Sequence, residues 1–173
     1  MSNNIEIKAH VSNLLNLRKK VEESCGKHED LLYQRDVFYN LKKYRIKLRN
    51  VNGDSELIIY KRENTSGPKQ SSYIRIPVAL PKLVHAILKT TLGIRGIVEK
   101  KRTLFFSEQT RIHLDEVEGL GTFLEFEVVL NSDDTPEAGV LIANKLMKQL
   151  EIQKVDLISG SYIDLIEKNL RRN

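Results

Sequence analysis

Two acidic residues, Glu125 and Glu127, are separated by a single residue in the segment 111–130. Alternation of side chains along a strand places both carboxylates on one face and Phe126 on the other. Like charges held this close are unfavourable unless positive charge lies beside them. The pair therefore predicts either a bound metal ion or a lining of basic side chains next to it.

Basic side chains recur with the same alternation on other segments of the chain. Arg45, Lys47 and Arg49 share one face of a predicted strand, and Lys100 and Arg102 share a face of another. The charged side chains that we expect to face one another are Glu6, Lys8, Arg45, Lys47, Arg49, Lys61, Arg75, Lys100, Arg102, Asp115, Glu125 and Glu127. Cations at this density indicate a polyanion between them, and the carboxylates suit a hard cation such as Mg²⁺ or Mn²⁺. A metal-bound triphosphate meets both requirements.

These side chains need a framework of strands to bring them together. Alternation predicts strands at 5–11, 31–39, 44–51, 56–62, 72–76 and 97–107, followed by two more within 111–130. Amphipathic helices are predicted at 13–24, 82–92 and 136–150 and from Ser161, with a strand or extended segment at 152–158. Asn52-Gly53 is a strong hairpin signal.

The predicted strands carry charge on one face and aliphatic residues on the other. Helices that cover the aliphatic faces would turn the charged faces inward. Closing such a sheet would give an α+β fold, an eight-stranded antiparallel β-barrel, or tunnel, with helices packed outside it. The alternative is an open sheet whose charged face lies in water, and the periodicity permits both.

The composition limits the classes of protein that the chain can represent. Its 173 residues suffice for one domain, residues 1–173, and the net charge of +5 indicates an anionic partner. Cys25 is the only cysteine, which excludes an internal disulfide, and no Cys or His spacing is typical of a zinc site. Neither a signal peptide nor a membrane-spanning segment is evident. We expect a cytoplasmic monomer or homodimer that does not bind membranes. Nucleic acid is a possible but less favoured partner, because the aromatic residues are too sparse to form a surface for base stacking.

Taken in order, these motifs resemble the CYTH or triphosphate-tunnel family, which includes class IV adenylate cyclases and thiamine triphosphatases. The resemblance covers residues 4–166 and is carried by Asn4-Ile5-Glu6-Ile7-Lys8, Arg45-Ile46-Lys47-Leu48-Arg49, the segment 57–61, Lys100-Lys101-Arg102, His113-Leu114-Asp115-Glu116-Val117 and Glu125-Phe126-Glu127. Each motif alone is weak, but the ordered series is specific. The resemblance implies an eight-stranded tunnel that binds a triphosphate-containing small molecule, with a metal at the Glu-x-Glu end.

The resemblance also implies roles for particular residues. The expected ligands of Mg²⁺ or Mn²⁺ are Glu6, Glu125 and Glu127. The expected phosphate contacts are Lys8, Arg45, Lys47, Arg49, Lys61, Lys100 and Arg102. Lys8, Lys61 and Asp115 are expected to take part in catalysis.

Asn4 departs from the family pattern, because it stands where the first glutamate of the opening motif would be. An amide oxygen can coordinate a hard cation, but it attracts the cation less than a carboxylate does. Three functions are therefore open. We favour a divalent-metal-dependent enzyme that hydrolyses the terminal phosphate of a nucleoside, thiamine or inorganic triphosphate. The alternatives are a class IV-type adenylate cyclase, which makes cyclic AMP and pyrophosphate from ATP, and a non-catalytic binder of nucleotide, polyphosphate or RNA ends.

Overall fold

The computed structural model describes residues 2–26, 30–62 and 64–171. The strands are β1 (Ser2–His10), β2 (Asp30–Tyr39), β3 (Arg45–Val51), β4 (Asp54–Arg62), β5 (Lys69–Pro77), β6 (Ile94–Ser107), β7 (Thr110–Val117) and β8 (Gly121–Val129). The helices are α1 (Leu14–Cys25), α2 (Pro81–Leu92), α3 (Pro136–Gln149) and α4 (Tyr162–Leu170), with a short 3-10 helix, η1, at Lys154–Asp156. None of the helices within these ranges has the length and apolarity that crossing a bilayer requires.

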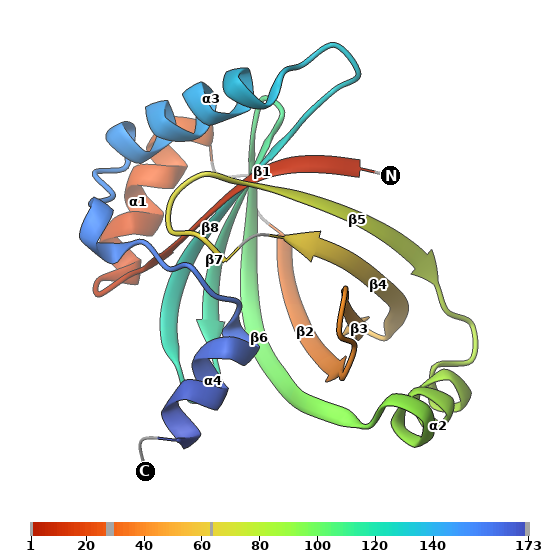
Figure 1. Ribbon diagram of the computed structural model, residues 1–173. Coiled ribbons are helices and arrows are strands. Elements are labelled where there is room, and N and C mark those ends of the chain that lie inside the picture. The colour runs from red at the N-terminus through yellow and green to blue at the C-terminus, as the bar shows by residue number, and fades with distance from the viewer. Residues whose placement is uncertain (1, 27–29, 63, 172–173) are drawn as a thin grey trace.

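The strands close into one antiparallel barrel in the order β1-β5-β4-β3-β2-β6-β7-β8 (Figure 1). The first strand closes the barrel, because β1 pairs with β5 on one side and with β8 on the other. Closure pairs the first strand of the sheet, β1, with the last, β8, so the sheet has no unpaired edge strand within the described residues. The predicted α+β fold, an eight-stranded antiparallel barrel with helices packed outside, is confirmed.

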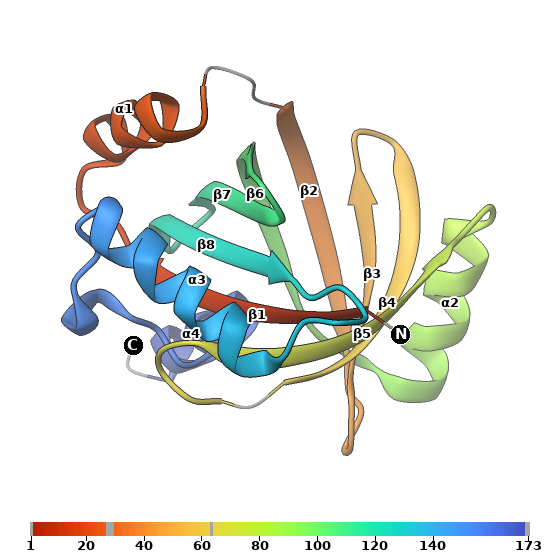
Figure 2. The same ribbon diagram turned by 90° about the horizontal axis from the view of Figure 1, so that it is seen from above.

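Helices cover two separate parts of the outer surface of the barrel. α1 and α3 lie together on one side and α2 lies on the opposite side, as Figures 1 and 2 show. The largest apolar core lies beneath α1 and α3 and includes Ile7, Phe105 and Phe126. α3 approaches β1 so closely that a Cβ on Gly139 would come within 2.6 Å of Ile5. The aliphatic faces of the strands are therefore buried outside the barrel, which leaves the charged faces to line its interior.

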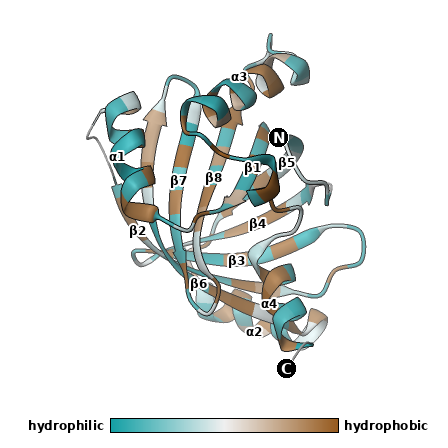
Figure 3. Cartoon of the chain, turned by 90° about the vertical axis from the view of Figure 1, so that its left-hand side faces the viewer, coloured by the Kyte–Doolittle hydropathy of each residue, from teal (hydrophilic) through white to brown (hydrophobic). Residues whose placement is uncertain are grey.

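The two-residue period of the strands is visible as alternating hydrophilic and hydrophobic bands in Figure 3. The apolar layer between the barrel and the helices outside it is called the outer core below. In β8, Phe126 is fully buried in the outer core, whereas Glu125 and Glu127 line the interior of the barrel. The β3–β4 hairpin turns at Asn52 and Gly53, whose φ angles of 51° and 105° are those that this turn requires. The hairpin fixes the register that carries the basic face of β3 into the barrel.

The segment 152–158 differs from the predicted strand or extended segment. It contains η1, and it joins the sheet only through an isolated bridge between Leu157 and Ala9. β5 pairs with β1 only over Ser2–Glu6, so the second half of this edge of β1 is open to the segment. Ile158 N donates to Lys8 O there at 2.8 Å, but η1 before it and α4, which begins at Tyr162, limit the pairing to this short contact.

Candidate functional site

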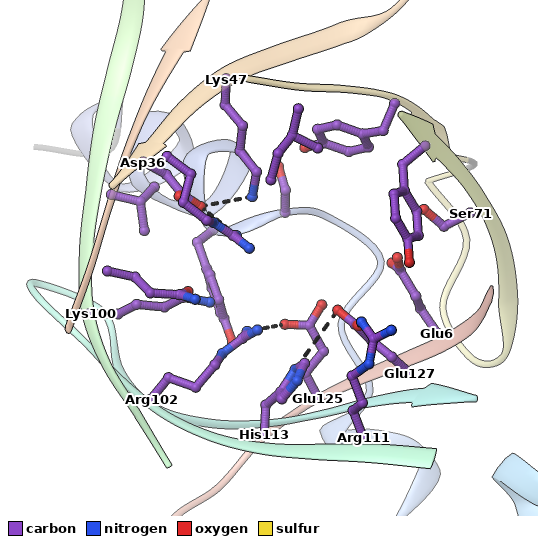
Figure 4. A pocket seen from close by; sticks show the side chains of 18 of the residues that line it. Glu6, Asp36, Lys47, Ser71, Lys100, Arg102, Arg111, His113, Glu125 and Glu127 are labelled. Atoms are coloured by element: carbon purple, nitrogen blue, oxygen red, sulfur yellow. Dashed lines mark hydrogen bonds and ion pairs between the residues drawn. The ribbon is translucent and has the colours of Figure 1, made fainter. Parts of the chain in front are cut away.

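The barrel encloses a cavity of about 300 Å³ whose wall is strongly charged (Figure 4). The cationic side chains in this wall are Lys8, Lys47, Arg49, Arg75, Lys100, Arg102 and Arg111. The carboxylates in the wall are those of Glu6, Asp36, Glu125 and Glu127. Because the cations outnumber the carboxylates, the cavity favours an anionic ligand. Its volume lies at the lower end of the range for small-molecule pockets.

On one side of the cavity, Asp36 of β2 holds two cations of the neighbouring strand β3. Arg49 Nε donates to Oδ1 at 2.8 Å, Arg49 Nη2 donates to Oδ2 at 2.9 Å, and Lys47 Nζ donates to Oδ2 at 2.7 Å. The contact follows from the register, which sets Asp36 directly opposite Arg49. Burial opposes ionisation of Asp36, but Arg49 and Lys47 outweigh it and hold the pKa of this carboxyl well below its usual range.

Asp115 of β7 holds a second Lys-x-Arg pair, on β6, in the same manner. Arg102 Nε and Nη2 donate to its two oxygens at 2.6 and 2.7 Å, and Lys100 Nζ donates at 2.9 Å. The register again sets the aspartate opposite the arginine. Since β3, β2, β6 and β7 are consecutive in the barrel, the two clusters lie side by side. Cations fixed in this way are suited to hold phosphate oxygens.

The lysines of both clusters lose part of their basicity in the interior. Burial, reinforced by the charge of Arg49, lowers the pKa of Lys47 to about 8. Burial, reinforced by the charge of Arg102, lowers the pKa of Lys100 to about 7. A polyanion in the cavity would favour the ammonium form of both side chains. An anion bound in this cavity would therefore be accompanied by protonation of these lysines.

Glu125 is neutralised by two cations from neighbouring strands. Its Oε2 lies 3.1 Å from Lys8 Nζ and accepts a hydrogen bond of 2.8 Å from Arg102 Nη2. Burial opposes its ionisation, but Lys8 and Arg102 outweigh it and hold the pKa of Glu125 well below its usual range. This carboxylate is therefore charged, and both contacts keep the cations pointed into the barrel.

A second group of oxygen atoms, at the β1–β8 contact, suits a metal ion. Glu6 and Glu127 lie directly opposite each other and both line the cavity. Asn4 is 1% exposed, and its Oδ1 has no hydrogen-bond partner among the described residues. Within the same residues, no three His, Cys, Asp or Glu side chains are placed to hold an ion by themselves. Mg²⁺ usually takes only one or two carboxylates and completes its shell with water and substrate phosphates, so this donor set fits.

His113 lies next to these carboxylates but is a poor proton acceptor. Its Nδ1 is 3.8 Å from Glu127 Oε1 and makes no hydrogen bond within the described ranges. Burial, reinforced by the charge of Arg102, lowers the pKa of His113 to about 3, so the ring is neutral at neutral pH. The geometry assigns it no general-base role.

The structure does not bring every expected phosphate contact to the cavity. The expected placement of Lys61 needs correction, because its side chain is exposed on the outer face of β4. The register pairs Ile58 with Lys47 and Tyr60 with Arg45, so Ile58 and Tyr60 face inward and Lys61 faces outward. Arg45 lies on the inward face of β3 but outside the cavity wall, since it donates to Asp164 of α4 at 3.1 Å.

Several wall residues lay outside the set expected from sequence. Asp36 was not assigned a site role, although alternation places it on the same face as Phe38. Arg111 also enters the cavity and pairs with Glu127 at 3.2 Å (Figure 4). Gln34 lines the wall with a buried Oε1 that lacks a hydrogen-bond partner among the described residues. Asp36 and Gln34 are polar residues at alternate positions of one strand. This alternation was the sequence signal that could have identified both as facing inward.

Comparison with known proteins gives consistent results. The model of the CYTH domain matches residues 2–162. A protein of Methanocaldococcus jannaschii, named as a candidate adenylate cyclase, is 23% identical over 93% of this chain and 97% of its own length. A Pyrococcus horikoshii protein of known structure has a TM-score of 0.81 at 24% identity, covering 94% of this chain and 98% of its own. A Hippeastrum protein, described as a candidate adenylyl cyclase with a dominant triphosphatase activity, has a TM-score of 0.67 at 13% identity over 98% and 96% of the two chains.

Proposed function

The chain belongs to the CYTH family, and from this premise we propose that it is a divalent-metal-dependent triphosphatase acting on a nucleoside, thiamine or inorganic triphosphate. Members of this family generally act on triphosphates and typically require a divalent metal. One observation carries the proposal: two Lys-x-Arg pairs, each held by an aspartate of the adjacent strand, lie side by side in one barrel.

The proposed reaction needs positioning and charge stabilisation more than covalent chemistry. Water attacks the terminal phosphorus, the bond from this phosphorus to the bridging oxygen breaks, and the remaining phosphates leave. The proton of the water ends on the released orthophosphate, and in the transition state negative charge spreads over the phosphoryl oxygens and the leaving group. In this proposal the oxygens are held by cations that line the cavity, namely Lys8, Lys47, Arg49, Lys100 and Arg102. Because carboxylates already fix these cations, the site needs little reorganisation when charge develops, which favours the transition state.

Glu6 and Glu127 are the side chains that would hold the metal, with Asn4 Oδ1 as a neutral ligand. When bound, the metal neutralises phosphate charge and acts as a Lewis acid on the phosphoryl oxygens. Glu125, also an expected ligand, is better assigned to holding Lys8 and Arg102, since both already contact its Oε2. Asp115 is better assigned to positioning, because its two oxygens are occupied by hydrogen bonds.

Cyclisation of ATP is the second candidate reaction. The relative from M. jannaschii is named as a candidate adenylate cyclase, and the apolar residues Leu32, Leu104 and Phe106 give part of the cavity wall a surface for an organic group. The activity described for the Hippeastrum protein supports hydrolysis. A non-catalytic binder is the third outcome that the experiment below distinguishes.

Product analysis tests the proposal. Purified protein is incubated with ATP, tripolyphosphate and thiamine triphosphate, each with Mg²⁺, Mn²⁺ or EDTA, and the products are separated by chromatography. We expect metal-dependent release of orthophosphate from at least one substrate. Cyclic AMP with pyrophosphate would establish the cyclase instead, and binding without turnover of any of them would establish a non-catalytic role.

Asn4→Asp is expected to strengthen Mn²⁺ binding by about 10-fold, because it adds a charged oxygen ligand beside Glu6. Without metal the same change should lower the melting temperature, since it buries a third carboxylate near Glu6 and Glu127. Mn²⁺ titration followed by thermal unfolding measures both effects. Asn3→Asp is the matched control, because the Asn3 side chain is exposed on the outer face. Equal effects of the two variants would contradict the placement of the metal.

Triphosphate binding at pH 8 is expected to take up protons. The pKa values of Lys100 and Lys47, about 7 and about 8, leave both partly neutral in the free protein, and a bound polyanion raises both. The bound state then carries more protons, so affinity should fall as the pH rises from 7 to 9. ATP is a suitable probe, because the last ionisation of a phosphate ester has a pKa of about 6. Calorimetry of ATP binding with EDTA, in buffers of different ionisation enthalpy, measures the uptake.

The control for this measurement uses two lysine-to-arginine changes. Lys100→Arg keeps a charge that does not titrate, so it should reduce proton uptake, whereas Lys101→Arg on the outer face should not. Release of protons, or equal uptake by both variants, would contradict the lowered pKa of Lys100.

A further inference from the structure

α4 sends one aromatic side chain from its first residue into the barrel. Tyr162 is 5% exposed, and its ring packs against Phe123 with 5.0 Å between centroids. Ser161, which precedes it, also lines the cavity. The helix therefore stays outside the barrel while its first side chain becomes part of the charged wall.

The hydroxyl group of Tyr162 is hydrogen-bonded to a charged carboxylate. Its hydroxyl donates to Asp115 Oδ2 at 2.8 Å, the oxygen that Lys100 Nζ and Arg102 Nη2 also reach. Burial, reinforced by the negative charges of Asp115 and Glu125, raises the pKa of Tyr162 well above its usual value. The hydroxyl therefore stays protonated and remains a donor to this carboxylate.

The face of the same ring lies against the amino groups of two lysines. Lys8 Nζ is 3.8 Å and Lys100 Nζ is 5.0 Å from the ring centroid. A cation within about 6 Å of an aromatic face is attracted to it, and more strongly when it is desolvated. Directly or through Asp115, Tyr162 thus contacts three cations of the wall, namely Lys8, Lys100 and Arg102.

The docking of α4 depends on other side chains. Arg95 forms ion pairs of 2.6 Å with Asp164 and 2.8 Å with Glu167, and Arg45 forms one of 3.1 Å with Asp164. These contacts hold the helix without using the Tyr162 hydroxyl. Removal of that hydroxyl should therefore leave the helix docked, which makes its contribution to the site separately measurable.

We infer that Tyr162 is a positioning residue of the triphosphate site, whose hydroxyl and ring together fix the directions in which three cations point into the cavity. The inference rests on the proposed function. A tyrosine that only filled the core would need its ring and not its hydroxyl, because phenylalanine would pack in the same space. The hydroxyl therefore distinguishes positioning from packing.

Tyr162→Phe is expected to raise the Kd for tripolyphosphate by about 10-fold, which corresponds to about 1.4 kcal/mol and is the scale of one hydrogen bond to a charged group. Tyr162→Leu also removes the aromatic face and should weaken binding further. Calorimetry with EDTA present measures binding without turnover, and kcat/KM with Mn²⁺ should fall by at least the same factor. The free Phe variant should melt a few degrees below the wild type, because Asp115 loses one buried donor, so binding is compared at a temperature at which both proteins are fully folded.

Two control variants separate positioning from helix docking. Glu167→Gln weakens the Arg95 contact and leaves the contacts of Tyr162 intact. Tyr33→Phe removes a phenol that is 60% exposed on the outer face of β2. Both should bind tripolyphosphate as the wild type does. In an Asp115→Asn background, Tyr162→Phe should have a smaller effect than it has alone, because neighbours that act through one another are not additive.

Each result supports or overturns the inference. A Phe variant that binds within twofold of the wild type would overturn it while leaving the proposed function in place. An equal loss in Glu167→Gln would also overturn it, since helix docking would then explain the effect. A wild-type protein that binds no tripolyphosphate would overturn the proposed function and the inference together.

Discussion

Replacement of Arg102 by methionine is expected to abolish measurable triphosphate binding and to destabilise the fold. The guanidinium donates to both oxygens of Asp115 and to Glu125. Methionine fills part of the same space but leaves two buried carboxylates without this partner. Breaking a buried charge pair in this way typically lowers the free energy of unfolding by about 3–5 kcal/mol. Calorimetry with tripolyphosphate and urea unfolding measure the two effects.

Lys101→Met is the matched control for this change. Lys101 is the preceding residue of the same strand, points outward and forms an ion pair of 3.4 Å with Glu116. Exposed pairs of this kind contribute at most about 1 kcal/mol, so binding should not change. If Arg102→Met is too unstable to assay, Arg102→Lys is the alternative. It keeps the charge but lacks the planar guanidinium with its paired N–H donors, so it should weaken binding by about 10-fold. Wild-type affinity in Arg102→Lys would contradict the importance of these paired donors.

Glu127→Gln is expected to reduce metal-dependent turnover by about 100-fold, which is the scale for losing one group that stabilises the transition state. The amide is nearly isosteric, so the fold should be retained, but one of the two paired carboxylates is lost. The concentration of Mn²⁺ needed for half-maximal turnover should rise. Steady-state rates over a range of Mn²⁺ concentrations, with circular dichroism of both proteins, measure this.

Glu116→Gln provides the comparison for the loss of one carboxylate. Glu116 lies on the outer face of β7, where its partner is Lys101. This variant should keep wild-type turnover and the same dependence on Mn²⁺. Unchanged kinetics in Glu127→Gln would count against Glu127 as a metal ligand, and equal losses in both variants would remove the argument for the β1–β8 site.

Alternation of residue types predicted most of the charged face of the sheet, and the resemblance to the CYTH family predicted that the sheet closes into a barrel. Glu125 and Glu127 face inward because the residues between and beside them are needed for the outer core, as Phe126 shows. Lys100 and Arg102 follow the same rule on β6, where Phe105 faces the helices. The pattern is informative here because helices cover the aliphatic faces, so a residue on the wrong face would bury a charge in the outer core.

Lys61 shows where this reasoning was insufficient. Alternation along β4 places Lys61 on the same face as Leu57 and Ile59, and both of those residues pack near α2 in the outer core. The family motif suggested an inward lysine, but the register with β3 places Ile58 and Tyr60 inside. Cross-strand register depends on how the hairpin closes, and a strand that is apolar on both faces does not reveal from sequence which face is buried inside.

The partners of the charged residues could not be predicted from the sequence. Asp36 and Asp115 belong to different strands from the lysines and arginines that they hold, so only the folded register reveals the pairs. The helix from Ser161 was predicted to be amphipathic, and its Leu165 and Ile166 do pack on the domain, but Tyr162 becomes part of the cavity wall. Contacts between elements far apart in the chain have no local sequence signal.

The most direct test of this account is the anomalous diffraction of crystals grown with tripolyphosphate and Mn²⁺. We predict a manganese peak between Glu6 and Glu127, with phosphate groups inside the barrel against Lys47, Arg49, Lys100 and Arg102. A tripolyphosphate bound on the outer surface, or a manganese peak away from both glutamates, would contradict the claim that the barrel interior is a metal-dependent triphosphate site.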